Sequence, residues 1–390
     1  MRSAPRLFPF LLATLWTVFA GPGAAPAHAQ TADPMASAAQ HVTILDFKTG
    51  GLLYCKDCET PIPPASMSKL MTVLVVAEKL KSGAISWDTQ FPVSENAWRH
   101  GAQSDGSHMF LELNSMVSVR DLLSGVVIVS ANDACIALAE GISGSEANFV
   151  ALMNERAKAL GFKSAHFTNV TGLDDPNHMI SSADLARLSR HITLQFPDIY
   201  KLDSVRSFTY NKHTQENRNP LLGRFDGADG VKTGHTDSSG YGMIGSATRN
   251  GERRIIVFNG LPTMAARLSE GMRLMAAAFN AFDAKRLFEK GAKVGEAEVF
   301  MGGKKTVPLV ATAAFDVAYM RLAKDGLKVE IVYDGPIPAP IKKGAVVAKL
   351  VFHGPGVSTL ELPLAAGESV GRENIFSRAV AGAKAAFGGS

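Results

Sequence analysis

The chain is most informative between residues 64 and 72, where it reads Pro64-Ala65-Ser66-Met67-Ser68-Lys69-Leu70-Met71-Thr72. Prolines precede this stretch and a largely apolar run follows it, which predicts a buried helix that opens at Ser66 and stops at Gly83. Ser66 and Lys69 are three residues apart and would share a face of that helix. A lysine held in a crowded, apolar site is neutral enough to take the proton of a serine hydroxyl. The spacing alone is equally compatible with a helix-capping serine beside a surface lysine.

Two triplets further along the chain favour the catalytic interpretation. Ser130-Ala131-Asn132 offers a hydroxyl that can relay protons and an amide that can hold a substrate amide. Lys232-Thr233-Gly234 offers a cation and a hydroxyl on a strand edge, and its glycine allows close approach of the backbone. S-x-x-K, S-D-N and K-T-G are together typical of penicillin-binding proteins and class A β-lactamases. All three occur here in order, with Ala131 in place of the aspartate.

Two other matches are predicted to be structural. Lys48-Thr49-Gly50 precedes the serine and falls in a predicted hairpin turn. Ser94-Glu95-Asn96 follows Ser66 after only a short interval and has no apolar element before it.

Through these three motifs and the residues around them, the chain resembles the D-alanyl-D-alanine carboxypeptidases, the low-molecular-mass penicillin-binding proteins of the bacterial periplasm. The stretches that carry the resemblance surround the three motifs and extend beyond them: residues 64–72, 130–135, 167–169, 172–174 and 229–236. The resemblance covers nearly everything after the N-terminal segment. It implies an α+β fold, with a β-lactamase/transpeptidase-like catalytic domain followed by a small all-β domain.

The resemblance also implies roles for the residues of the three motifs. Ser66 would be the acylated nucleophile and Lys69 its general base. Ser130 and Lys232 would assist proton transfer to the leaving D-alanine.

Four further residues would bind the substrate or the developing charge. Asn132 would orient the substrate peptide, and the backbone N–H groups of Ser66 and His235 would form the oxyanion hole. Thr233 and Arg267 would hold the terminal carboxylate of the substrate. For Arg267 the alternative is a solvated arginine at the start of a helix. The implied chemistry uses no cofactor and no metal, since no second histidine is spaced to join His235 as a metal ligand.

The function implied is removal of the terminal D-alanine from peptidoglycan pentapeptide stems, with penicillins as covalent inhibitors. The alternatives are a D,D-endopeptidase, a serine β-lactamase and a non-catalytic scaffold. Class A β-lactamases deacylate with a glutamate acting through water, whereas residues 171–176 contain no glutamate. Glu146 and Glu155 lie on a predicted amphipathic helix and are expected to be solvated.

Composition indicates a folded, exported protein of two domains. The chain has 390 residues, of which 46% are hydrophobic and 19% charged, a globular composition. The net charge of +4 comes without a run of five basic residues, so no nucleic-acid partner is expected. Arg2 and Arg6, an apolar run and Ala27-His28-Ala29 predict a signal peptide over residues 1–29 and a periplasmic location. In an oxidising compartment Cys55 and Cys58 form either a small disulfide or nothing of consequence, and Cys135 is left free.

The pattern changes near residue 288. The predicted catalytic domain spans residues 30–287, and the alternation of Leu327, Val329, Ile331 and Tyr333 predicts a β domain over residues 288–371. Residues 372–390 return to helical spacing with one apolar arc, which predicts an amphipathic helix. Such a helix either lies in the outer surface of the inner membrane or docks on the β domain.

Overall fold

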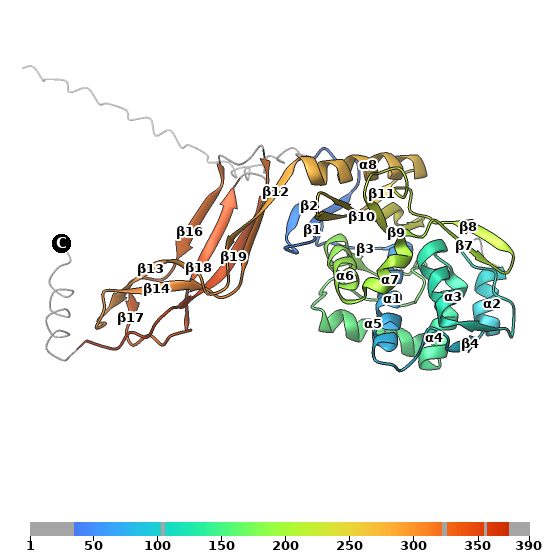
Figure 1. Ribbon diagram of the computed structural model, residues 1–390, viewed down its shortest axis with the longest axis horizontal. Coiled ribbons are helices and arrows are strands. Elements are labelled where there is room, and N and C mark those ends of the chain that lie inside the picture. Colours follow the sequence, from blue (N-terminus) through green and yellow to red (C-terminus); the bar gives the residue numbers. More distant parts are fainter. Residues whose placement is uncertain (1–34, 103–105, 322–325, 355–356, 374–390) are drawn as a thin grey trace, which may run out of the picture. The chain divides into compact units, whose positions relative to one another are not determined.

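The computed structural model describes residues 35–102, 106–321, 326–354 and 357–373 (Figure 1). All helices and strands described below belong to the compact unit that spans Ser37–Ser390. The predicted signal peptide, residues 1–29, and residues 374–390 of the predicted C-terminal helix lie outside the described residues. Within the described residues, no helix is both long enough and apolar enough to cross a membrane.

An antiparallel sheet of five strands, in the order β2-β1-β11-β10-β9, forms the frame of the catalytic part. Its strands are β1 (His41–Asp46), β2 (Leu52–Lys56), β9 (Ala228–Thr236), β10 (Gly240–Arg249) and β11 (Glu252–Leu261). The two predicted hairpins, one around residues 48–51 and one around Asn250-Gly251, join β1 to β2 and β10 to β11, as predicted. The sheet thus combines two strands from the start of the described chain, β1 and β2, with three strands that follow residue 227.

Eight helices accompany this sheet: α1 (Lys69–Lys81), α2 (Glu95–Ala102), α3 (Val119–Ser124), α4 (Asn132–Ser143), α5 (Glu146–Ala159), α6 (Ser182–Gln195), α7 (Pro197–Tyr200) and α8 (Met264–Asn280). Helix α8 contacts β10 and β11 on one face of the sheet, and α6 contacts β1 and β11 on the other, together with the remaining helices (Figure 1). Side chains of a strand alternate between faces. Ile255 and Val257 accordingly pack in the helical core, and the alternate side chain of Phe258 comes close to Gly271 of α8.

Short elements complete the catalytic part. They are the 3₁₀ turns at Ala65–Ser68 and Lys201–Ser204, a π-helical turn at Gly125–Val129, and three strand pairs: β3 (Pro61–Ile62) with β6 (Ile180–Ser181), β4 (Gln90–Pro92) with β5 (Met116–Ser118), and β7 (Ser207–Tyr210) with β8 (His213–Glu216). The first of these turns corrects a prediction. The α-helix begins at Lys69 rather than at Ser66, which lies in the 3₁₀ turn before it.

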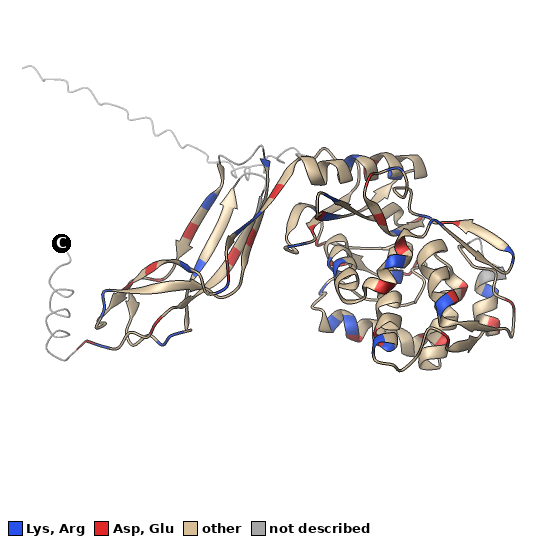
Figure 2. Ribbon diagram, in the orientation of Figure 1, with Lys and Arg blue, Asp and Glu red and all other residues tan. Residues whose placement is uncertain are grey.

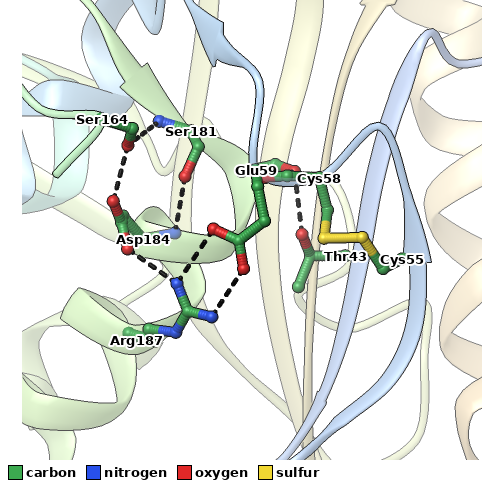
Figure 3. A network of polar contacts seen from close by, with 9 residues as sticks. Thr43, Cys55, Cys58, Glu59, Ser164, Ser181, Asp184 and Arg187 are labelled. Carbon is green, nitrogen blue, oxygen red and sulfur yellow. Dashed lines mark hydrogen bonds and ion pairs between the residues drawn. A yellow bond between two sulfur atoms is a disulfide. The ribbon is translucent and has the colours of Figure 1, made fainter. Parts of the chain in front are cut away.

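Cys55 and Cys58 form a disulfide across the turn that follows β2 (Figure 3). The carbonyl of Cys58 accepts hydrogen bonds from the N–H of Ala183 and the hydroxyl of Ser182, at the start of α6. Glu59, the next residue, pairs with Arg187 of the same helix. These contacts hold the disulfide turn against the start of α6. Of the two possibilities that the sequence left open for these cysteines, the structure shows the disulfide.

The C-terminal part is all β, as predicted. Two strands, β12 (Phe282–Phe288) and β15 (Phe315–Met320), pair with each other. Six more form a sheet in the order β16-β18-β19-β14-β13-β17, with bounds Lys328–Val332, Val346–Gly354, Val357–Ala366, Thr306–Ala311, Lys293–Phe300 and Ile337–Pro338. The inward side chains build a core of their own, which includes Val307, Leu309, Leu350 and Leu364.

Both ends of this β part bear on the predicted boundaries, which stay predictions. Strand β12 begins at Phe282, six residues before the predicted boundary. Arg372 forms a β-bridge with Gly302 instead of beginning a helix. Basic and acidic residues are interspersed along the helices and strands (Figure 2).

Candidate active site

The amino group of Lys69 donates a hydrogen bond to the hydroxyl oxygen of Ser66 across 2.8 Å. Lys69 is the first residue of α1 and Ser66 lies one turn earlier, so the local backbone alone brings the two side chains together. Lys69 is completely buried. The alternative of a surface lysine beside a capping serine is therefore wrong, and Ser66 caps no helix through its side chain.

Burial changes the acid–base behaviour of Lys69. The low-polarity surroundings lower its pKa from the usual 10.5 to about 8, because a buried ammonium loses its hydration. The neighbouring Cys135 and Asp133 act in the opposite direction and only partly offset the burial. With a pKa of about 8, roughly a tenth of the Lys69 amines are unprotonated at pH 7, and this neutral form can act as the general base.

A loop after α5 gives Lys69 its second partner. The amino group donates to the carbonyl of Thr171 across 2.5 Å. Asn169 shapes this loop, since its side-chain oxygen accepts hydrogen bonds from the N–H groups of Thr171 and Gly172. Gly172 has φ of +79°, and a Cβ there would lie 2.0 Å from the carbonyl oxygen of Ala65. The loop can therefore approach the serine turn only with glycine at this position.

Ser130 and Lys232 form a second hydroxyl–amine pair. The amino group of Lys232 donates to the hydroxyl of Ser130 across 2.7 Å, although the two residues are 102 positions apart. Ser130 has φ of +67° at the end of the π-helical turn, a conformation that residues other than Gly, Asn and Asp rarely adopt. Burial, and then the charge of Lys69, lower the pKa of Lys232 well below its usual value.

Asn132 is the first residue of α4, two positions after Ser130, and its side chain is buried at the cleft. Its N–H donates to the carbonyl of Ser107, which also lines the cleft. The carboxylate of Asp133 accepts hydrogen bonds from the N–H groups of Met109 and Leu111. This carboxylate therefore fixes the segment around residues 107–111 against the start of α4.

Strand β9 brings the third motif against the serine turn. A Cβ at Gly234 would lie 2.8 Å from the carbonyl oxygen of Pro64, so glycine is needed for this approach. Thr233 is buried, and His235, the next residue after the glycine, is exposed at the cleft. Ser66 and His235 both line the cleft, as their expected role in an oxyanion hole requires.

Arg267 lies beside His235 at the start of α8. Its side chain is 7% exposed, and its Nε has no hydrogen-bond partner among the described residues. The guanidinium lies 5.5 Å from the ring centre of Tyr241, whose ring stacks on that of His235. The alternative of a solvated arginine is wrong. A buried guanidinium without an acidic partner is suited to a carboxylate ligand.

These residues surround one cleft of about 380 Å³. Of the eight predicted site residues, Ser66, Ser130, Asn132, Thr233, His235 and Arg267 line it. Lys69 and Lys232 lie beneath its surface and reach it through the two serine hydroxyls. None of the residues of the two structural matches lines the cleft. Ser94 caps α2, and Thr49 helps to close the β1–β2 turn.

Several cleft residues were not predicted from sequence. Ser107, Arg218 and Tyr241 line the cleft, but none of them belongs to one of the three motifs, and the contact of the Thr171 carbonyl with Lys69 was not predicted either. One prediction about the surroundings also needs correction. Glu146 is half-buried, and its carboxylate accepts a hydrogen bond from the N–H of Val170, whereas Glu155 is exposed as predicted.

A sequence profile of the D-alanyl-D-alanine carboxypeptidase family matches residues 28–262. The chain belongs to this family. A second profile, the C-terminal domain of penicillin-binding protein 5, matches residues 282–372. The predicted resemblance is thereby confirmed for both parts of the chain.

Relatives and solved structures agree with this assignment. D-alanyl-D-alanine carboxypeptidase DacA of Haemophilus influenzae is 37% identical over 343 residues, which make up 87% of each chain. DacC of Escherichia coli is 35% identical, with coverage of 90% of this chain and 88% of the relative. The crystal structure of penicillin-binding protein 5 from H. influenzae matches with a TM-score of 0.72 at 37% identity, covering 86% of this chain and 98% of that one. The predicted fold class is likewise confirmed.

A further match connects the fold with β-lactam binding. Penicillin-binding protein D2 of Listeria monocytogenes, in its ampicillin-bound form, matches with a TM-score of 0.56 at 32% identity. That match covers 62% of this chain and 97% of the Listeria chain.

Proposed function

We propose that this family member removes the terminal D-alanine from peptidoglycan stem peptides through an acyl-enzyme on Ser66. The observation that carries the proposal is the contact between the Ser66 hydroxyl and the buried amine of Lys69, at 2.8 Å. The family assignment supports a carboxypeptidase over the endopeptidase and β-lactamase alternatives.

The proposed reaction begins when neutral Lys69 takes the proton of Ser66. The serine oxygen attacks the carbonyl carbon of the penultimate D-alanine. The N–H groups of Ser66 and His235 then stabilise the negative charge that develops on the carbonyl oxygen. The carbon–nitrogen bond then breaks, and the leaving nitrogen receives a proton through Ser130, which is held by Lys232. Water hydrolyses the ester and restores the Ser66 hydroxyl.

Substrate binding is proposed to use the remaining cleft residues. The side chain of Asn132 would hold a peptide amide of the stem. Thr233 and Arg267 would bind the terminal carboxylate. The electrostatic attraction between a guanidinium and an anion is stronger in a buried site, such as that of Arg267, than at an exposed one. A penicillin carboxylate would use the same two residues while its lactam carbonyl acylates Ser66.

We further propose a periplasmic location after cleavage of a signal peptide at residue 29. The support is the sequence of residues 1–29 and the disulfide between Cys55 and Cys58, since such bonds persist in oxidising compartments.

The test is a serine substitution with a matched control. Ser66→Ala should abolish both D-alanine release from a pentapeptide and covalent labelling by a fluorescent penicillin, with an unchanged far-UV circular dichroism spectrum. Ser94→Ala, in the structural match, should keep both activities. Penicillin labelling of Ser66→Ala at another residue would refute the assignment of the nucleophile.

A further inference from the structure

A small cavity borders Lys232 inside the catalytic part. Its volume is about 10 Å³, enough for one water molecule. Besides apolar side chains, its wall contains four residues with polar groups: Ser189, Tyr200, Asp203 and Lys232. All four are buried. They come from α6, α7, the 3₁₀ turn at Lys201–Ser204 and β9, so the cavity lies where four elements pack together.

Three of these residues have hydrogen-bonding capacity left over for a ligand in the cavity. The hydroxyl of Ser189 has no partner among the described residues, and the side chain of Asp203 accepts no hydrogen bond from them. Lys232 donates to the Ser130 hydroxyl and to the carbonyl of Thr233, which leaves the third hydrogen of its ammonium form. A buried water molecule needs two to four such partners, so this cavity is suited to hold one.

The fourth residue, Tyr200, is already engaged. Its hydroxyl donates to Asp229 across 2.7 Å and accepts a hydrogen bond from Arg253. Asp229 in turn forms an ion pair with Arg253 at 2.6 Å. This second carboxylate therefore has a cation of its own, whereas Lys232 is the cation that acts on Asp203.

Asp203 is a carboxylate whose charge acts on Lys232. Burial, and then the charge of Lys69, lower the pKa of Lys232, with a smaller effect of Arg218 in the same direction, and Cys135 and Asp203 oppose them. Burial raises the pKa of the Cys135 thiol to about 12, so this thiol is uncharged near neutral pH. Burial raises the pKa of Asp203 as well, and the charge of Lys232 opposes that shift. Each of the two groups therefore favours the charged form of the other.

We propose that Asp203 is a positioning residue for proton delivery: through a water molecule bound in this cavity, it keeps Lys232 protonated beside the Ser130 hydroxyl. This inference rests on the proposed function, in which the leaving nitrogen receives its proton through Ser130. A positive charge next to a hydroxyl favours loss of its proton, so Ser130 is a better acid while Lys232 is charged. Asp203 does not line the cleft and acts through Lys232.

The test uses two substrates that differ in one atom. In a pentapeptide stem the departing nitrogen must take up a proton, whereas in the analogue with sulfur in place of that nitrogen a thiolate departs without one. Asp203→Asn keeps the shape of the side chain and removes its charge. It should lower kcat/KM for the peptide at least about tenfold and that for the thioester by no more than about threefold. Chromatography of the released D-alanine and a thiol assay give the two rates.

Two further variants separate the charge from its surroundings. Asp198→Asn is the matched control, because Asp198 is an exposed carboxylate of the neighbouring α7 that pairs with Lys201. It should leave both rates within about twofold, as expected for a surface ion pair. Ser189→Ala removes a partner of the bound water but no charge. It should lower the peptide rate about threefold and leave the thioester rate unchanged.

Equal losses for the two substrates in Asp203→Asn, or full peptide activity, would overturn the inference and leave the proposed function standing. Far-UV circular dichroism shows whether Asp203→Asn folds, and if it does not, Ser189→Ala decides the question by the same criterion. A wild-type enzyme that releases no D-alanine and is not labelled by penicillin would overturn the proposed function itself.

Discussion

Lys69 illustrates how a single buried side chain sets the chemistry of this cleft. Without the amine, the Ser66 hydroxyl stays protonated and attacks poorly. Lys69→Ala should therefore lower the rate of acylation by penicillin about a hundredfold or more, the usual contribution of a general base. Lys48→Ala, in the structural Lys-Thr-Gly match, should keep most activity. Stopped-flow labelling with a fluorescent penicillin measures both, and equal losses would contradict the assignment of Lys69.

The lowered pKa of Lys69 predicts how activity depends on pH. The neutral amine is the active form, and with a pKa of about 8 its fraction falls as the pH falls below that value. The acylation rate should decrease close to tenfold for each pH unit below about 7 and level off above about 8. Circular dichroism over the same range separates this effect from unfolding. A rate that is constant between about pH 6 and 8 would show that Lys69 is not the titrating base.

At the scale of the element, the loop of residues 169–173 positions Lys69 through its backbone. Gly172→Ala should displace this loop from the serine turn, because the new Cβ would meet the carbonyl of Ala65. Gly161→Ala is a matched control, since Gly161 has a similar φ of +76° but open space around it. Both should lose about 1 kcal/mol of stability from the left-handed backbone.

Only Gly172→Ala should also lose most of its acylation activity. Thermal unfolding and penicillin labelling of the two variants separate the general backbone cost from the displaced loop. Similar activity in both would show that this contact has no catalytic importance.

The same loop predicts slow release of penicillin. Residues 171–176, which overlap the end of this loop, contain no glutamate that could activate water, and their two carboxylates, Asp174 and Asp175, accept hydrogen bonds from Ser238 and from the N–H of Asn177. The penicilloyl-enzyme should therefore persist for minutes or longer, in contrast to class A β-lactamases. Loss of fluorescent label after a chase with unlabelled drug measures this lifetime. Turnover of many penicillin molecules per second would favour the β-lactamase alternative.

At the scale of the whole molecule, the amphipathic helix predicted over residues 372–390 is expected to attach the protein to the inner membrane. A truncation after Glu373 is the suitable variant, because Arg372 and Glu373 still bond to the β part through Ala339 and Met301. The truncated protein should move from the membrane pellet to the soluble fraction, with unchanged activity on a soluble pentapeptide. An unchanged distribution would exclude the anchor, and a lower Tm would indicate that the segment docks on the protein.

The sequence alone determined the three motifs, the order of the two parts and the main hairpins, because these depend on local spacing and alternation. It placed the start of α1 at Ser66 instead of Lys69, since the periodicity of side chains does not distinguish a 3₁₀ turn from the first turn of an α-helix.

Only the tertiary structure decided the partners over long distances. The contact of Ser130 with Lys232, the hydrogen bond from Lys69 to the carbonyl of Thr171 and the burial of Arg267 all depend on segments that are remote along the chain. No local pattern specifies such contacts. They arise because helices pack on both faces of the sheet and bring these segments together at the cleft. Burial there lowers the pKa of Lys69 and of Lys232.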